Sequence, residues 1–446
     1  MEKVKLSEII FWCKGNVNKR YKDVFVKGIS TDTRTLKKGE IFIALKGEKY
    51  DGHNFVKEAF KKGAIGVIVS ERYQIQNSFL LIKVKDTLKA LGDISRNYRK
   101  NLNMHVVGIT GSDGKTTTKE IIKNILSEKF NTVSTIGNFN NEIGLPISIL
   151  NADRKTKFGV FEMGMNKKGE IDYLSRICIP DISVITNVGI AHIGFFKNRK
   201  EIADAKAEIF KNLTGEKIVF LNRDDLFFYY LKNKAKSKNI ISIGVKKKGD
   251  INGKIVEEGI DYFIFEHNMK KYKMNFWNNS FIYSGLFGIA FAEKFEIQKK
   301  YIEDVLLNTK PLSGRGDFIK NKIQIIDESY NSNPNSLRNA LICLDKKPLK
   351  RKIVILGDMA ELGKFTNFYH YYIGTLVKKL NIDILLTFGE KSKIISDVSK
   401  KGNHFYHLEE LLKYLKKTIK NEDTIFIKGS RFLKMERIVD FLKKEI

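Results

Sequence analysis

A glycine-rich stretch between Gly108 and Thr117 contains the residues whose types and spacing point most directly to chemistry. It follows the apolar pair Val106-Val107 and opens a segment whose apolar residues recur at helical spacing. In a strand–loop–helix layout, backbone N–H groups bind phosphate oxygens, Lys115 neutralises their charge and Thr116 can ligate Mg²⁺. Ile109 stands where the usual phosphate-loop pattern has its first glycine, so a plain helix-capping turn is the alternative. We predict a nucleoside triphosphate site formed by Gly111, Ser112, Asp113, Gly114, Lys115, Thr116 and Thr117.

Two side chains that suit a hard cation follow later apolar runs. Glu162 closes the run from 158 to 161, and His192 comes soon after the run from 182 to 187. Parallel strands end at one edge of a sheet, so both side chains should lie near the phosphate loop and ligate Mg²⁺ there. Taken alone, Glu162 would be an ordinary ion-paired carboxylate and His192 a structural loop residue.

Three further segments carry side chains that could contact ligands. Lys206 lies in a predicted helix from 203 to 210, and a solvated helix lysine is the simplest interpretation of it. An asparagine-rich run spans 138 to 146, and a second polar run from 327 to 334 follows a predicted strand. Either run could ligate ions or contact substrate, although turn chemistry alone also explains both.

The elements that would hold these residues predict an α/β fold of three domains, because 446 residues exceed one ordinary core. We expect a small N-terminal α/β domain (1–85), a central ATP-binding domain with a parallel sheet (86–312) and a C-terminal Rossmann-like domain (313–446). The predicted strands are 40–45, 65–69, 159–163, 182–186, 323–326, 352–356, 382–386 and 424–427. The predicted helices are 55–60, 87–98 and 285–296, and β-hairpins are predicted within 254–282.

The formal net charge of +29 would suit a nucleic acid or an anionic membrane. The lysines are spread along the chain, however, and neither an RNA-binding aromatic motif nor a zinc-type Cys/His spacing occurs. We therefore predict a surface that attracts polyanionic small molecules, and no nucleic-acid partner. Three isolated cysteines fit a reducing cytosol, and the apolar segment from 9 to 13 is too short for a signal peptide. We expect a cytoplasmic monomer without membrane insertion.

Together these motifs resemble those of the Mur ligases, in the family's order and over nearly the whole chain. The resemblance adds an N-terminal motif and a set of C-terminal ones, which are similar to those of members that join D-alanyl-D-alanine to UDP-N-acetylmuramoyl-tripeptide. The matching segments are Thr31–Arg34, Gly52–Phe55, Gly111–Thr117, Asn140–Pro146, Glu162–Gly164, Thr186–His192, Ala205–Phe210, Ser313–Arg315, Tyr330–Pro334, Leu356–Gly363 and Lys428–Arg431.

The resemblance implies a role for each matched residue. Lys115 and Thr116 would bind the phosphates of ATP and Mg²⁺. Glu162 and His192 would each ligate one of two metal ions, and Lys206 would be carbamylated and face them. The implied nucleotide contacts from the C-terminal domain are Arg315, Asp327, Glu328 and Asn331, and the implied substrate contacts are Thr31, Asp32, Thr33, Arg34, His53, Asn140 and Asn141.

The chain departs from the family's pattern at two places. Glu328 stands where the family usually has an aspartate, so which of Asp327 and Glu328 acts stays open. The family's His-Asn-x-x-Asn helix start is replaced by the segment from 280 to 284, so the residues that contact the base stay open as well.

The implied reaction is ATP-driven amide formation. A substrate carboxylate attacks the γ-phosphate, and an incoming amine then displaces phosphate from the acyl phosphate. No nucleophilic serine or cysteine is required, which agrees with the absence of a Gly-x-Ser-x-Gly or Cys/His signature. Another Mur-type ligase or a folylpolyglutamate-synthase-like ligase is the nearest alternative, and the Thr31–Arg34 motif counts against the second. From another class, a basic nucleic-acid-binding ATPase would explain the charge.

Overall fold

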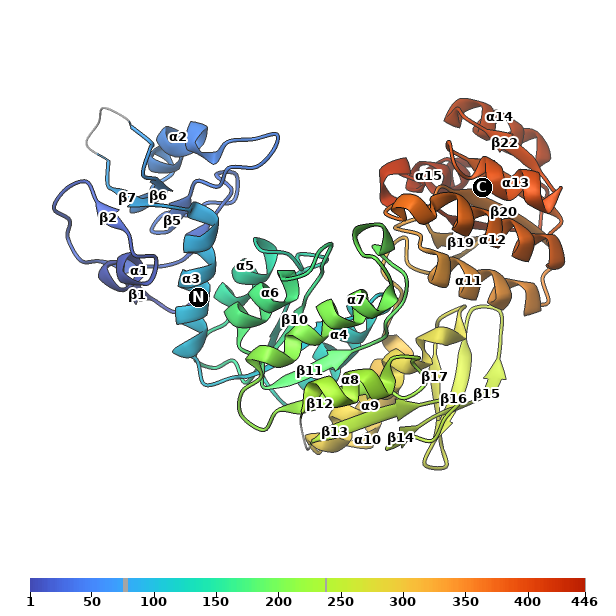
Figure 1. The fold of residues 1–446 in the computed structure, drawn as a ribbon, viewed down its shortest axis with the longest axis horizontal. Coiled ribbons are helices and arrows are strands. Elements are labelled where there is room, and N and C mark those ends of the chain that lie inside the picture. Colours follow the sequence, from blue (N-terminus) through green and yellow to red (C-terminus); the bar gives the residue numbers. More distant parts are fainter. Residues whose placement is uncertain (75–78, 237–238, 446) are drawn as a thin grey trace.

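The computed structural model describes residues 1–74, 79–236 and 239–445, and these form three α/β units built on separate sheets (Figure 1). The N-terminal and C-terminal units lie on opposite flanks of the central one (Figure 1). The predicted fold class is confirmed. Among the described helices, none combines the length and the apolar character needed to cross a membrane.

The N-terminal unit contains a five-stranded sheet in the order β2-β7-β6-β5-β4, in which only β2 is antiparallel to its neighbour. A separate strand pair, β1 with β3, lies beside helix α1. The elements are β1 (Val4–Lys5), α1 (Leu6–Trp12), β2 (Asn16–Val17), β3 (Phe25–Val26), β4 (Ile29–Ser30), β5 (Ile41–Ile43), α2 (Val56–Lys61), β6 (Gly66–Ser70) and β7 (Leu81–Val84). Helix α3 (Thr87–Lys100) follows and leads into the central unit.

The central unit is built on a seven-stranded parallel sheet in the order β14-β13-β12-β11-β8-β10-β9. Successive residues of a strand face opposite sides, so Val107 and Ile109 pack with α4 and with α9 (Ile282–Lys294), while Val106 packs with α3, α5 and α6. The elements are β8 (His105–Thr110), α4 (Lys115–Ser127), β9 (Thr132–Ser134), α5 (Gly144–Leu150), β10 (Phe158–Glu162), α6 (Glu170–Cys178), β11 (Ile182–Ile185), α7 (Arg199–Ala207), β12 (Ile218–Asn222), α8 (Phe228–Ala235), β13 (Ile240–Gly244) and β14 (Ile251–Asn252).

The chain order of this sheet reverses at β8. Strands β9 and β10, which follow β8 in sequence, lie on one side of it, and β11 to β14 lie on the other. Open parallel sheets bind ligands at such a reversal, beyond the carboxyl ends of the strands. The phosphate loop follows β8, Glu162 ends β10, and the segment with His192 follows β11, so all three reach this edge.

A three-stranded antiparallel sheet, β15 (Lys254–Glu258), β16 (Phe263–His267) and β17 (Lys270–Met274), precedes helices α9 (Ile282–Lys294) and α10 (Lys299–Asn308). The predicted hairpins are confirmed, but the helix begins earlier than predicted. Asn278 caps a short 3-10 turn by accepting from the Ser280 N–H, and α9 continues from that turn. The predicted helix from 203 to 210 also differs, because α7 ends at Ala207 and continues as a 3-10 turn, Glu208–Asn212.

The C-terminal unit has a six-stranded sheet in the order β18-β19-β23-β20-β21-β22, in which only β18 is antiparallel to its neighbour. The four predicted strands correspond to β19, β20, β21 and β23, whereas the short β18 and β22 were not predicted. The elements are β18 (Asp317–Lys320), β19 (Gln324–Glu328), α11 (Pro334–Lys346), β20 (Arg351–Gly357), α12 (Thr366–Lys379), β21 (Ile384–Phe388), α13 (Lys393–Ser399), β22 (Asn403–Phe405), α14 (Leu408–Thr418), β23 (Asp423–Lys428) and α15 (Glu436–Glu445).

Candidate active site

The phosphate loop is tied to the end of the neighbouring strand β11. The Thr186 hydroxyl donates to the Asp113 carbonyl at 2.7 Å, and the Asp113 N–H donates to Asn187 Oδ1 at 3.0 Å. The Ser112 N–H donates to the Asn187 carbonyl at 3.1 Å. A Cβ on Gly111 would lie 1.8 Å from Thr186 Oγ1, so the loop can approach this strand only with glycine there. These hydrogen bonds and the close contact at Gly111 fix the shape of the phosphate loop.

Helix α4 begins directly at the end of this loop. Gly114 precedes it with φ of +77°, a conformation that favours glycine, and Lys115 is its first residue. Lys115 Nζ donates to the Gly111 carbonyl at 2.8 Å. Burial lowers the pKa of Lys115, and the charges of Glu162 and Asp113 oppose that shift. The Thr116 hydroxyl accepts from Arg315 Nη1 at 3.0 Å, which joins this helix to the C-terminal unit.

Glu162 is a buried carboxylate, 1% exposed, at the end of β10. Its Oε1 accepts from Asn140 Nδ2 at 2.7 Å, and its backbone N–H donates to Thr135 Oγ1 at 2.9 Å. Its other carboxylate oxygen, Oε2, is buried and has no hydrogen-bonding partner among the described residues. A buried anionic oxygen that faces no donor suits a cation, because an unpaired charge in the interior is costly.

His192 lies at the contact between the central and C-terminal units. Its φ is +63°, and its Nδ1 lies 2.7 Å from Glu361 Oε2. The hydrogen bond with His192 lowers the pKa of Glu361. Two residues on, the Gly194 N–H donates to the Glu361 carbonyl at 2.8 Å, and a Cβ on Gly194 would lie 2.5 Å from the Gly363 nitrogen. The two loops therefore touch backbone to backbone.

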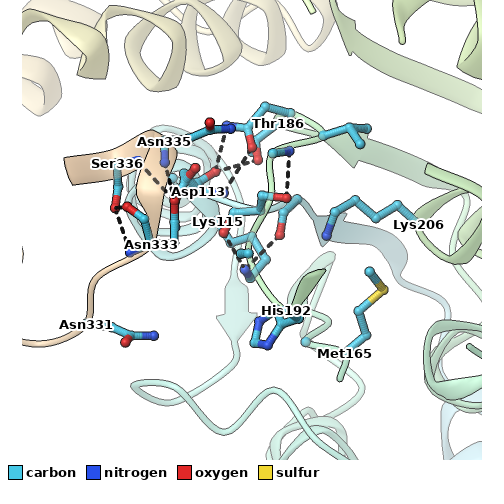
Figure 2. Close-up of a pocket in the computed structure, with 18 of the residues that line it drawn as sticks. Asp113, Lys115, Met165, Thr186, His192, Lys206, Asn331, Asn333, Asn335 and Ser336 are labelled. Carbon is cyan, nitrogen blue, oxygen red and sulfur yellow. Dashed lines mark hydrogen bonds between the residues drawn. The ribbon is translucent and has the colours of Figure 1, made fainter. Parts of the chain in front are cut away.

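Lys206 is only 2% exposed, near the end of α7. Figure 2 shows its side chain extending toward the space between Lys115 and His192. Burial lowers the pKa of Lys206 well below its usual value, and the nearby Lys115 charge lowers it further. The carboxylates of Asp113 and Asp225 oppose these effects. The site therefore favours a neutral amine at Lys206, which sequence alone does not predict.

Two side chains clamp the segment between Asn187 and His192. Arg199 Nη2 donates to the Val188 carbonyl at 2.6 Å, and the Val188 N–H donates to Asp225 Oδ2 at 2.7 Å. Both side chains line the same cavity as the phosphate loop. Sequence reasoning missed them, because neither belongs to a motif that it used.

The C-terminal unit contributes an asparagine-rich turn to the site. Asn333 Nδ2 donates to Asp113 Oδ1 at 2.6 Å, and Asn333 also caps α11 by accepting from two backbone N–H groups (Figure 2). The Tyr330 hydroxyl accepts from Asn138 Nδ2 at 2.8 Å, and the Arg315 guanidinium lies 3.9 Å from the Tyr330 ring centroid. The chain between β19 and α11 is therefore held against the phosphate loop.

The two acidic residues at the end of β19 have different surroundings. Asp327 is 3% exposed, and its Oδ1 accepts from the Ser329 N–H at 3.0 Å. Glu328 accepts from Lys428 Nζ at 2.8 Å and lines the cavity, which Asp327 does not. Lys428 also donates to the Asn331 carbonyl at 3.1 Å.

One cavity of about 1060 Å³ brings most of the predicted residues together. Thr116 does not line it, although Lys115 and Thr117 on either side do. Within the described residues, no group of three or more His, Cys, Asp or Glu side chains could hold a metal ion on its own. The predicted residues that line the cavity are Gly111, Ser112, Asp113, Gly114, Lys115, Thr117, Asn140, Asn141, Glu162, His192, Lys206, Arg315, Glu328 and Asn331.

Comparison with known proteins agrees with this architecture. Three family models match in succession: "Mur ligase family, catalytic domain" over 25–99, "Mur ligase middle domain" over 109–290, and "Mur ligase, glutamate ligase domain" over 314–431. A curated protein of Buchnera aphidicola subsp. Acyrthosiphon pisum, named UDP-N-acetylmuramoyl-tripeptide--D-alanyl-D-alanine ligase, is 36% identical over 434 residues, covering 95% of this chain and 94% of that protein. The chain belongs to the Mur ligase family.

Solved structures resemble this Mur ligase along its whole length. A crystal structure of MurF from Acinetobacter baumannii has a TM-score of 0.92 at 30% identity and covers 99% of both chains. The MurF ligase of Thermotoga maritima, solved in complex with ADP, has a TM-score of 0.82 at 28% identity and covers 94% of this chain and 98% of that one.

The N-terminal residues predicted for this Mur ligase do not line the cavity. Arg34 is exposed and pairs with Asp32, its Nη2 lying 2.6 Å from Asp32 Oδ2. His53 is held by its own domain, since its Nδ1 lies 2.6 Å from Asp51 Oδ1 and its Nε2 accepts from the Ser70 N–H at 3.0 Å. Thr31 and Thr33 lie on the same loop after β4. Their predicted contacts with a substrate stay predictions.

Proposed function

We propose that this Mur ligase uses ATP to join D-alanyl-D-alanine to a UDP-N-acetylmuramoyl-tripeptide in peptidoglycan precursor synthesis. The observation that carries the proposal is the whole-length likeness to ligases of that name, in a chain whose cavity joins a phosphate loop to the C-terminal unit. Members of this family are ATP-dependent amide ligases. In this proposal, residues 1–85 bind the uridine-linked substrate, residues 86–312 bind ATP and residues 313–446 bind the dipeptide.

ATP would lie across the phosphate loop at the start of α4. The loop N–H groups and the N-terminus of α4 suit the phosphates, and Lys115 would exchange its bond to the Gly111 carbonyl for a phosphate oxygen. Arg315 already reaches Thr116 and would add a second cation from the C-terminal side. The relative from Thermotoga maritima that was solved with ADP supports nucleotide binding by this fold.

The proposed reaction requires no nucleophilic side chain of the protein, because the substrates react with each other. A carboxylate oxygen of the tripeptide attacks the γ-phosphorus, the bond to the ADP oxygen breaks, and an acyl phosphate forms. The amine of the dipeptide then attacks the acyl carbon, the carbon–oxygen bond to phosphate breaks, and the amine proton is lost. The contribution of the protein is to position both substrates, to offset charge and to exclude water from the acyl phosphate.

The residues around Glu162 fit a divalent cation such as Mg²⁺. Oε2 of Glu162 is buried without a hydrogen-bonding partner among the described residues. The other predicted ligands are the Thr116 hydroxyl, the His192 imidazole and a carbamylated Lys206. When bound, Mg²⁺ would offset the charge of the transferring phosphoryl group. Phosphate oxygens would complete its ligand set, because the described carboxylates and imidazoles do not form a set of three.

Lys206 is proposed to carry a carbamate. Its burial and the nearby Lys115 charge favour the neutral amine, which is the form that attacks CO₂. The amine nitrogen forms a bond to the carbon of CO₂, one C=O bond opens to give the second carboxylate-like oxygen, one N–H proton is released, and a neutral amine becomes an anionic carbamate. That change places anionic oxygens near the Lys115 ammonium and supplies oxygen ligands within the cavity that Glu162 also lines.

The decisive experiment is ADP formation measured with the purified chain. ATP, UDP-N-acetylmuramoyl-tripeptide and D-alanyl-D-alanine are supplied singly, in pairs and together. The proposal requires sustained turnover only with all three, and a UDP-linked pentapeptide as the product by mass spectrometry. Turnover with a different amino acid in place of the dipeptide, or stimulation of ATP hydrolysis by DNA alone, would contradict it.

A further inference from the structure

Lys119 is a buried lysine that none of the proposed catalytic steps uses. It lies on α4 one turn after Lys115, and it is 0% exposed. Its Nζ donates to the Thr135 carbonyl at 2.7 Å and to the Gly137 carbonyl at 3.2 Å, and it lies 2.8 Å from Glu120 Oε1. A buried ammonium needs such partners, since an unpaired interior charge is costly. The helix is therefore bonded to the chain that leaves β9.

The segment from 135 to 141, here called the asparagine loop, holds Glu162 at two points. The Thr135 hydroxyl accepts from the Glu162 N–H at 2.9 Å, and Asn140 Nδ2 donates to Glu162 Oε1 at 2.7 Å. The Thr135 N–H donates to the Val160 carbonyl at 3.1 Å, so Thr135 is where pairing with β10 ends. Lys119 contacts the asparagine loop at residues 135 and 137, before the loop reaches the Glu162 carboxylate through Asn140.

The same loop reaches the C-terminal unit. Asn138 Nδ2 donates to the Tyr330 hydroxyl at 2.8 Å, and the Tyr330 ring lies beneath the Arg315 guanidinium. Arg315 in turn donates to the Thr116 hydroxyl, which returns to α4. A closed circuit of contacts thus begins and ends on the helix that follows the phosphate loop, and Lys119 makes its connection from that helix to the asparagine loop.

We propose that Lys119 is a positioning residue for the ligase reaction. By holding the carbonyls of residues 135 and 137, its ammonium sets where Asn140 meets Glu162 and where Asn138 meets Tyr330. It thereby couples the cation-binding carboxylate to the docking of the C-terminal unit. The inference rests on the proposed function, because that function gives Glu162 and the docked C-terminal unit their roles.

A purely structural role predicts a different result from a positioning role. Removing one partner of a buried ion pair leaves the other groups unpaired, so Lys119→Met should lower the temperature of thermal unfolding. The methionine side chain is one atom shorter than that of lysine, and it cannot donate the two hydrogen bonds to the carbonyls of residues 135 and 137. A purely structural role predicts only this loss of stability, whereas a positioning role predicts in addition impaired chemistry and a higher Mg²⁺ requirement in protein that is still folded.

The test compares Lys119→Met with Lys123→Met, a matched lysine one turn further along α4 whose Nζ donates to Asn124 Oδ1. For Lys119→Met we expect kcat to fall roughly 10–100-fold and the Mg²⁺ concentration for half-maximal activity to rise by a similar factor, as when a residue that orients a metal ligand is removed. The KM for the uridine-linked substrate should stay within about twofold, because the described contacts of Lys119 are with residues 120, 135 and 137 of the central unit. Lys123→Met should match the wild type.

Hydrogen exchange separates this inference from the proposed function, because it needs no turnover. The amides of 136–141 should exchange faster in Lys119→Met than in the wild type, while those of α4 stay unchanged. An unchanged exchange rate there, or a wild-type kcat and Mg²⁺ requirement, would overturn the role of Lys119 alone. Inactivity of the wild-type chain with all three substrates would instead reject the proposed function. If Lys119→Met does not fold, Lys119→Gln is judged by the same two measurements.

Discussion

The phosphate loop and the loop from Thr31 to Arg34 both follow parallel strands, yet they are held in opposite ways. The phosphate loop is bonded to the end of β11 through Thr186 and to the C-terminal unit through Asn333. Among the described hydrogen bonds, the Thr31–Arg34 loop is held only within its own unit, by Ser30 and by Lys62, whose Nζ donates to the Thr33 carbonyl at 2.8 Å. The Arg34 side chain is 85% exposed and paired with Asp32.

We infer from this difference how the two proposed substrates are bound. The phosphate loop has its shape before a nucleotide arrives, because strands and domains far apart in sequence determine it. The exposed Arg34 can exchange its local carboxylate for a substrate anion at little structural cost, since an exposed ion pair contributes little to stability. Four substitutions test this contrast, taken here from the largest expected effect to the smallest.

Lys115→Ala is the strongest test of the preformed phosphate loop. Among the described residues, Lys115 donates hydrogen bonds to two carbonyls of its own loop, so the fold should survive its loss, whereas turnover loses the cation next to the phosphates. We expect kcat/KM for ATP to fall about 100- to 1000-fold, as when one preorganised charge-stabilising donor is removed. ADP formation measures the loss, with Lys123→Ala as the control. Near-normal turnover would reject the phosphate-loop assignment.

Lys206→Ala tests whether the buried amine acts through an added carboxylate. We expect turnover to fall roughly 100-fold, with partial recovery when formate or acetate is added, because either supplies the missing oxygens. The control is Lys211→Ala, an exposed position on the following 3-10 turn. Native mass spectrometry of the wild-type protein in bicarbonate should show the added mass of CO₂ at Lys206. If that mass is never found, the carbamate is contradicted.

Gly194→Ala tests the contact between the central and C-terminal units. A methyl group there would lie 2.5 Å from the Gly363 nitrogen, so the two loops must separate. Displacing Arg315 and Asn333 from the phosphate loop should lower kcat by about tenfold, because small displacements of positioning groups are costly. Small-angle scattering should show a more extended particle than the wild type. Unchanged scattering and kcat would show that the contact is not needed for docking.

Arg34→Ala tests the Thr31–Arg34 loop and should have the smallest effect of the four substitutions. Losing one charge-assisted contact should raise the KM for the uridine-linked substrate about five- to tenfold and leave the KM values for ATP and the dipeptide unchanged. Arg72→Ala, an exposed arginine of the same unit, is the control. If all three KM values rise together, Arg34 acts on structure and the contrast between the two loops fails.

Much of the fold was predictable from the sequence because its signals are local. Apolar runs of strand length predicted β10 and β11 of the central sheet, and a polar helical segment predicted α3. The five-residue strands β12 and β13 were not predicted, and two-residue strands such as β14 carry too little pattern. The start of α9 was misjudged because a capping side chain, Asn278, lies before the apolar residues. The residue types of Lys115, Glu162 and His192 predicted their chemistry before their positions were known.

The sequence by itself determined the order of the elements, the glycine loop at the end of β8 and the reactive side chains at the strand ends. These depend on backbone geometry and on periodicity within a few residues. Only the tertiary structure decided that Lys206 is buried beside Lys115, that Arg199 and Asp225 clamp Val188, and that Lys119 is bonded to the asparagine loop. Each of these depends on burial or on contacts between separate elements, which no local pattern encodes.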